Sequence, residues 1–213
     1  MQRRIAAILL LSHALAFAAV IDRVAIVVGG RWIVKDSDIE RDVRATEFLN
    51  GQPLNLGKAA RKESANRLID QLFIRREILI GDYPQATPQQ ADQQIERLKK
   101  GKYKTEAAFQ SALQRYGMSE VEMRTQFQLQ LTVLQFIDVR FKPAVLVTDD
   151  EVEKYYRNHA AALRHDNPGK SLDDLREQIR DLIAGERVNQ QFFAWLNDQR
   201  KNSKVEFLEE SLA

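Results

Sequence analysis

The sequence predicts a mainly α fold, an irregular helical bundle with a small N-terminal β-hairpin that a C-terminal strand can extend. Three observations predict it: two β-branched runs joined by a glycine pair, apolar residues at three- and four-residue spacing, and repeated helix-capping signals. Hydrophobic residues make up 44% of the 213 residues and charged ones 29%, which is typical of a folded protein. No segment repeats at a period of about 30 to 45 residues, so a solenoid is not expected.

Residues 1–18 are expected to be a signal peptide. Two arginines precede an almost unbroken apolar run over residues 5–18. The run ends in the small-x-small pattern that signal peptidases cut, so cleavage is expected between Ala18 and Ala19. Residues 5–21 also match the shortest bilayer span, about 17 residues, so an uncleaved membrane anchor is the alternative.

The charge balance of the mature chain excludes one broad class of function. Without the leader, 30 basic residues face 30 acidic ones, so the net charge is zero with histidine neutral. A general nucleic-acid binder normally keeps a basic excess, and this class is therefore not expected. The absence of cysteine fits an exported protein that is large enough to fold without disulfides.

Two short strands are expected at the start of the mature chain. Residues 24–28 (VAIVV) and 32–34 (WIV) are β-branched and aromatic. Gly29 and Gly30 lie between them and can take the positive φ angles of a tight hairpin turn. Residues 205–208 (VEFL) are expected to close the chain as a further strand against this hairpin.

Capping boxes predict where helices begin. In such a box a Ser or Thr side chain and a Glu or Gln three residues later satisfy each other's free backbone N–H groups. Four boxes are spaced along the chain: Ser37 with Glu40, Thr87 with Gln90, Ser119 with Glu122, and Thr148 with Glu151. We expect a helix after each of them.

Apolar faces indicate the helices themselves. Residues 68–79 and 109–113 carry two of these faces. The helix expected over residues 120–141 has a second apolar edge, which places it in the middle of the bundle, and Pro143 ends it. The most regular pattern runs from about residue 172 to residue 200 and predicts a long C-terminal helix.

A phosphate-binding loop is suggested by Gly169, Lys170 and Ser171, but the surrounding sequence contradicts it. The motif needs a glycine five positions before Gly169, where this chain has Arg164. A buried strand should precede it, and the preceding segment has a helical pattern instead. Ser171 is better interpreted as the N-cap of the C-terminal helix, so no nucleotide site is expected.

No catalytic centre, metal site or cofactor is expected. His159 and His165 are six residues apart, whereas metal ligands on one helix usually lie three or four apart. The other histidine lies in the leader and there are no thiols, so solvated loop histidines are favoured. The basic run at residues 97–104 (RLKKGKYK) is interpreted as a solvated helix end stopped by Gly101, rather than as an anion site.

Six segments of the mature chain occur in an order that one protein family shares. They are residues 20–43 (VIDRVAIVVGGRWIVKDSDIERDV), 67–79 (RLIDQLFIRREIL), 87–100 (TPQQADQQIERLKK), 109–137 (FQSALQRYGMSEVEMRTQFQLQLTVLQFI), 147–156 (VTDDEVEKYY) and 192–210 (FFAWLNDQRKNSKVEFLEE). This series resembles the SurA family of periplasmic chaperones and covers nearly the whole mature chain. The resemblance implies that the long C-terminal helix packs back on the N-terminal part.

The chain also departs from that family. In the family, one or two parvulin-type prolyl isomerase domains lie between the EVEKYY-like helix and the C-terminal helix. Here residues 158–171 fill that interval, whereas a folded domain needs at least about 50 residues. We interpret this interval as a linker from which the isomerase domain is absent. The expected chaperone core is then residues 19–157, with residues 172–213 completing the same domain.

The resemblance implies an ATP-independent holdase in the periplasm that binds unfolded outer-membrane or secreted proteins and lacks prolyl isomerase activity. Contact with the membrane is expected only through the leader, before cleavage. Clients are expected to contact a surface that contains Tyr103, Tyr116, Met118 and Met123, because Met and Tyr adapt to varied partners. Core positions for Met123 and Met118 are the favoured alternative, because apolar residues at helical spacing are usually buried.

Two other functions stay open. One is a membrane-anchored assembly or scaffolding subunit for one dedicated partner, which would keep residues 1–21 as an anchor. The mass of the mature N-terminus distinguishes it from a secreted protein. The other is an isomerase-like enzyme with an unfamiliar site, or a hydrolase that uses His159 and His165.

Overall fold

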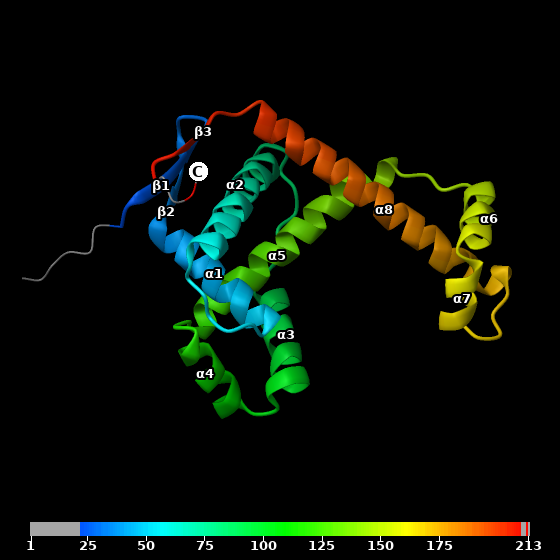
Figure 1. The fold of residues 1–213 in the computed structure, drawn as a ribbon, viewed down its shortest axis with the longest axis horizontal. Helices are drawn as coiled ribbons and strands as arrows, with labels where there is room; N and C mark the ends of the chain where they lie inside the picture. Colours follow the sequence, from blue (N-terminus) through cyan, green and yellow to red (C-terminus); the bar gives the residue numbers. More distant parts are fainter. Residues whose placement is uncertain (1–21, 210–211, 213) are drawn as a thin grey trace, which may run out of the picture.

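The computed structural model describes residues 22–209 and residue 212, and within them the predicted mainly α fold is confirmed. Figure 1 shows a helical body that carries a small sheet, with two short helices held away from it by the last helix. The helices are α1 (Asp36–Asn50), α2 (Lys58–Ile80), α3 (Pro88–Leu98), α4 (Glu106–Arg115), α5 (Glu120–Phe141), α6 (Asp149–Asn158), α7 (Ala160–Asp166) and α8 (Leu172–Lys201), with a π-helical segment η1 (Lys99–Tyr103) and a 3-10 turn η2 (Lys142–Ala144).

The sheet consists of β1 (Val24–Val28), β2 (Trp32–Lys35) and β3 (Val205–Phe207), all antiparallel, in the order β2-β1-β3. Gly29 and Gly30 have φ angles of 60° and 67°, which confirms the predicted glycine turn. The expected closing strand is also present, because β3 pairs with β1. β2 is therefore an edge strand of this sheet.

Three of the four predicted capping boxes are confirmed. The confirmed pairs are Thr87–Gln90, Ser119–Glu122 and Thr148–Glu151. Ser171 caps α8 in the same way, with Asp174 as its partner. Each cap satisfies backbone N–H groups that have no partner inside the helix.

The box predicted at Ser37 and Glu40 is wrong. α1 begins one residue before Ser37, and the backbone N–H of Lys35 donates to Asp38 over 3.1 Å. Ser37 therefore lies inside the first turn, where its hydroxyl donates to Asp22 over 2.7 Å. The aspartates of the first turn favour this start, because their charge opposes the positive end of the helix dipole.

The largest core lies between the sheet, α2, α5 and the C-terminal half of α8. Phe136 of α5 is fully buried there, and the rings of Tyr83, Phe141 and Trp195 pack around it at centroid distances of 5.0, 5.8 and 5.5 Å. Leu212, beyond β3, is also fully buried in this core. The C-terminal helix thus packs back on the N-terminal part, as predicted.

A second, smaller core joins α1, α3, η1, α4 and the start of α5. Phe48 and Phe109 are its largest buried side chains. The helix end predicted at Gly101 is wrong, because the chain continues through η1 as a π-helix. It turns at Lys104 instead, whose φ of 66° lies in the left-handed region. We call the sheet, α1 to α5 and the C-terminal half of α8 the main body.

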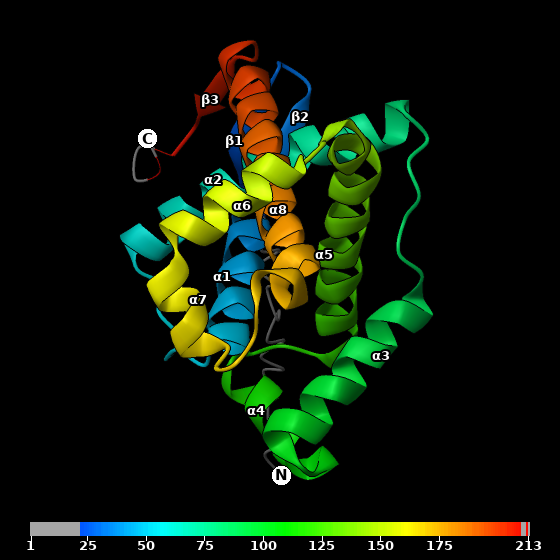
Figure 2. The ribbon, with the colours of Figure 1, turned by 90° about the vertical axis from the view of Figure 1, so that its right-hand side faces the viewer.

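A third core joins α6, α7 and the N-terminal half of α8, which we call the distal unit. Figure 2 looks from the side of this unit and shows α6 lying across α8, with α7 below it. Residues 158–171, predicted as a linker, contain α7, and Leu163 of this helix is buried in the distal core. Most other residues of the segment are exposed.

Within the described part of the chain, no helix is long and apolar enough to span a bilayer. The predicted leader, with its cleavage point between Ala18 and Ala19, falls outside the described residues.

Candidate functional site

The four residues predicted to contact clients lie together in the second core. Met123 is fully buried and Met118 is buried. Tyr103 stacks on Phe48 at a centroid distance of 5.8 Å, and Tyr116 meets the same ring edge-on at 5.5 Å. In this conformation Met123 therefore offers no surface to a client and Met118 offers very little. Contact between clients and the two half-buried tyrosines stays a prediction.

The histidines form no shared site. His159 stacks on Tyr155 at a centroid distance of 4.0 Å, and its Nδ1 lies 2.9 Å from the carbonyl oxygen of the same residue. His165 lies on α7 beside the exposed Asp166. Among the described residues, no group of three His, Cys, Asp or Glu side chains is placed to hold a metal ion.

The segment that resembles a phosphate loop is a turn and a helix cap. Gly169 has a φ of 82°, which the turn before α8 requires. The Ser171 hydroxyl accepts the backbone N–H of Asp174, and the backbone N–H of Ser171 donates to the Asp174 carboxylate. These hydrogen bonds keep the pKa of Asp174 below its ordinary value, with the bond from the Ser171 hydroxyl as the main cause.

The basic run contains one largely buried cation, which the prediction of a solvated helix end missed. The ammonium of Lys99 lies 2.9 Å from Glu106 and 3.2 Å from Glu120. Burial lowers the pKa of Lys99, but the hydrogen bonds to these glutamates outweigh burial and raise it above its ordinary value. Because the glutamates belong to α4 and α5, Lys99 holds these helices to η1. Lys100 and Lys102 are exposed, as predicted.

Three hollows of the main body adjoin one another along α2. A hollow of about 260 Å³ lies between α2 and α5, and a second of about 200 Å³ lies between β2, α1, α2 and α5. These two share Arg75, Thr125 and Leu129. A third, of about 240 Å³, lies between the hairpin turn and α2 and shares Leu72 with the second. We call the three adjoining hollows the α2 groove.

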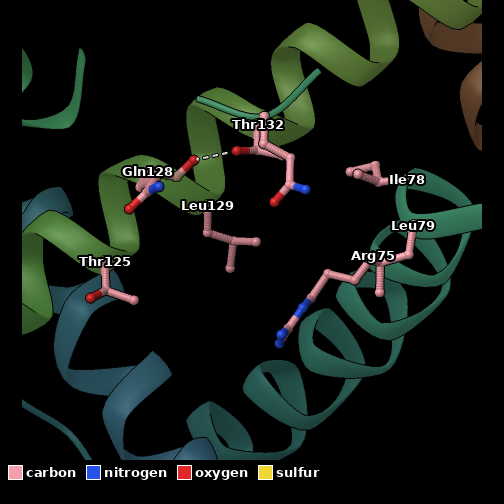
Figure 3. Close-up of a pocket in the computed structure, with 8 residues that line it drawn as sticks. Arg75, Ile78, Leu79, Thr125, Gln128, Leu129 and Thr132 are labelled. Atoms are coloured by element: carbon pink, nitrogen blue, oxygen red, sulfur yellow. Dashed lines mark hydrogen bonds between the residues drawn. The ribbon is translucent and has the colours of Figure 1, made fainter. Parts of the chain in front are cut away.

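The lining of the α2 groove is mainly apolar. Its larger apolar side chains that are half-buried or exposed are Ile33, Trp32, Leu68, Leu72, Leu79 and Leu129. Leu68, Leu72, Arg75 and Leu79 form one stripe of α2, as their spacing of three or four residues requires. Figure 3 shows Arg75 extending from α2, while Leu129 and Thr125 project from α5 on the opposite wall.

Two polar side chains on the α5 wall, Gln128 and Thr132, hydrogen-bond within the protein. The hydroxyl of Thr132 donates to the carbonyl of Gln128 over 2.8 Å and accepts the N–H of Ala86 over 3.0 Å (Figure 3). The side-chain amide of Gln128 donates to the carbonyl of Ala86 over 2.8 Å. These bonds attach the connection between α2 and α3 to α5.

The acidic side chains of the α2 groove are paired. Asp42 is buried and lies 2.7 Å from the guanidinium of Arg67. Asp38 lies 3.0 Å from Arg41. Arg75 stands apart, since it makes no hydrogen bond or ion pair with any described residue. The groove therefore has an uncompensated positive charge where its first two hollows meet.

Two other arginines of the groove also lack a carboxylate partner among the described residues. Arg31 lies over the ring of Trp32, 5.3 Å from its centroid. Arg76 donates to the amide oxygen of Gln199 and lies over the ring of Phe73. The α2 groove thus combines apolar walls with cations that no acidic side chain neutralises.

Large apolar side chains are exposed in the groove and elsewhere on the described surface. The most exposed are Leu146 (82%), Ile80 (76%), Leu79 (64%) and Val121 (64%). Leu79 lines the end of the α2 groove, and Ile80 follows it at the end of α2.

Sequence reasoning did not find this groove. The pattern of residues 68–79 predicts one apolar face, and it does not distinguish positions under the sheet from positions on an open wall. Arg75 interrupts that stripe, which is the one signal that points to an exposed wall. Arg75 lacks an ion-pair partner because Asp38 and Asp42 pair with other arginines, and the sequence does not show which arginine each aspartate contacts.

The comparisons with known proteins assign no family. No profile of a known protein family matches the chain, and no curated protein matches it.

Proposed function

We propose that this protein is an ATP-independent holdase of the periplasm, which binds unfolded outer-membrane or secreted polypeptides without prolyl isomerase activity. The observation that carries the proposal is the α2 groove, an open concave surface with mainly apolar walls that strands and helices of the main body form. An open groove suits a flexible chain better than a compact ligand, since small-molecule sites usually enclose most of their ligand.

The energy that a holdase needs is modest. Micromolar binding corresponds to about 8 kcal/mol. Burial of apolar surface contributes about 25 cal/mol per Å² before the costs of association are subtracted. The six large apolar side chains of the groove supply such surface, and unfolded clients expose apolar side chains in any order. Burial of apolar client surface in the groove requires no nucleotide.

The proposed absence of isomerase activity rests on the length of residues 158–171. This segment connects α6 to α8 through α7 and contains no room for a further folded domain of about 50 residues. The resemblance of the six sequence segments to the SurA family supports the chaperone part of the proposal.

The test is the aggregation of a denatured outer-membrane porin that is diluted into buffer with the purified protein, residues 19–213, and no nucleotide. Light scattering follows aggregation, and circular dichroism establishes that the protein is folded. Suppression at near-stoichiometric amounts, unchanged by ATP, is expected. Normal aggregation in the presence of the folded protein would contradict the proposal and favour an assembly subunit with one dedicated partner, to be identified by co-purification.

A further inference from the structure

The shape of the α2 groove favours an extended segment. The stripe from Leu68 to Leu79 spans eleven helical steps, or about 16 Å at 1.5 Å per residue, which is the length of about five extended residues. Ile33 and Val34 of the edge strand β2 line the same groove. Within the described residues no strand pairs with the outer side of β2, so its backbone can pair with an added strand.

The charges of the groove favour an acidic segment. Among the described residues the Arg75 side chain has no ion-pair or hydrogen-bond partner, whereas Asp38 pairs with Arg41 and Asp42 pairs with Arg67. The acidic side chains of α2 near the groove are also engaged, because Asp70 pairs with Arg200 and Glu77 pairs with Arg140. A cation on an apolar wall attracts a carboxylate, and a planar guanidinium can hold one with two hydrogen bonds.

The position of Arg75 indicates whether its carboxylate partner is the C-terminus of a bound segment or an acidic side chain within it. Arg75 lines both of the first two hollows, so the groove continues on either side of it. A terminal carboxylate would leave one of these hollows empty, whereas an Asp or Glu within a segment allows apolar neighbours to fill both. Resting on the function proposed above, we propose that the α2 groove binds extended apolar client segments that carry an acidic side chain, whose carboxylate pairs with Arg75.

The test uses three labelled peptides that differ at one position, with Glu, Gln or Lys in the middle of the same alternating apolar sequence. Fluorescence anisotropy measures their dissociation constants for the purified protein. We expect the Glu peptide to bind about three to ten times more tightly than the Gln peptide, because exposed charge pairs contribute little each. Salt at about 0.5 M should reduce this preference by screening.

Three variants sharpen the test. Arg75→Gln should abolish the preference for Glu, and Arg75→Glu should reverse it in favour of Lys. Arg164→Gln makes the same charge change on exposed α7, outside the groove, and should keep the preference. Equal binding of the three peptides to the unmodified protein would overturn the inference, as would equal loss of the preference in Arg75→Gln and Arg164→Gln.

Porin aggregation separates this failure from a failure of the proposed function. Suppression of aggregation together with equal binding of the three peptides leaves the holdase in place and removes the role of Arg75. Normal aggregation together with no peptide binding removes both.

Discussion

The main body and the distal unit are stabilised in different ways. Within the described residues, the largest core of the main body contains sixteen buried apolar side chains, whereas the core of the distal unit contains five. Around that small core, arginines of α8 meet carboxylates of α6: Arg180 lies 2.6 Å from Asp149, and Arg187 pairs with Glu151. Because exposed ion pairs contribute little and are screened by salt, we expect the distal unit to unfold first.

The largest expected loss of stability comes from a substitution in the core of the main body. Phe136→Ala removes a fully buried ring from the aromatic cluster and should lower the free energy of unfolding by about 3 to 5 kcal/mol. Urea denaturation followed by circular dichroism measures the change. Phe193→Ala, at an exposed position of α8, is the matched control and should change stability far less. Similar losses in both variants would contradict the position of the core.

The next effect should be confined to the distal unit. Ile179→Ala removes a fully buried side chain there and should cost about 2 to 4 kcal/mol. Hydrogen exchange should become faster in α6, α7 and the start of α8, while α2 and α5 keep their protection. Leu182→Ala, on the exposed side of the same helix, is the control. Equal acceleration throughout the molecule would show that the two regions unfold as one unit.

A smaller effect is expected at the start of α6. Thr148→Ala removes the N-cap side chain and should destabilise the helix by about 1 kcal/mol. The matched variant Ser119→Ala removes the corresponding cap of α5 in the main body. Hydrogen exchange of α6 should respond to the first variant and not to the second. A response of α6 to Ser119→Ala would contradict the separation of the two regions.

The smallest effect is the pH dependence of the distal unit. Hydrogen bonds from Arg187 and then from the backbone of Thr148 lower the pKa of Glu151 from 4.5 to about 2. Because the folded-state pKa is depressed, the stabilisation is present above pH 4.5 and is lost as the pH falls toward 2. Hydrogen exchange of α6 should report this loss, and Glu151→Gln should reduce it. An equal pH dependence in that variant would assign the effect to other groups.

The sequence predicted features that depend on neighbouring residues. The capping boxes at Thr87, Ser119 and Thr148 need only two side chains three residues apart, and the turn at Gly29 and Gly30 needs only permissive backbone angles. Such local chemistry can be found without knowledge of the tertiary structure.

Where the predictions failed, a distant or unusual partner decides the structure. Ser37 looks like an N-cap, but its hydroxyl donates to Asp22, and Lys35 is the N-cap of a helix that begins at Asp36. Gly101 looks like a helix end, but Lys99 is held by glutamates of two other helices and the chain continues as a π-helix. The α2 groove depends in the same way on how β2, α1 and α5 surround one stripe of α2.

Site-specific photo-crosslinking tests the central claim most directly, because it asks whether an unfolded client lies in the α2 groove of the main body. A photoreactive residue replaces Gln71, which lines the groove, or Gln178, which is exposed on α8 in the distal unit. Each variant is irradiated with denatured porin, with and without ATP. Porin crosslinked through position 71 and not through position 178, with no effect of ATP, is the predicted result. Absence of crosslinks at position 71, or equal yields at both positions, would contradict the account.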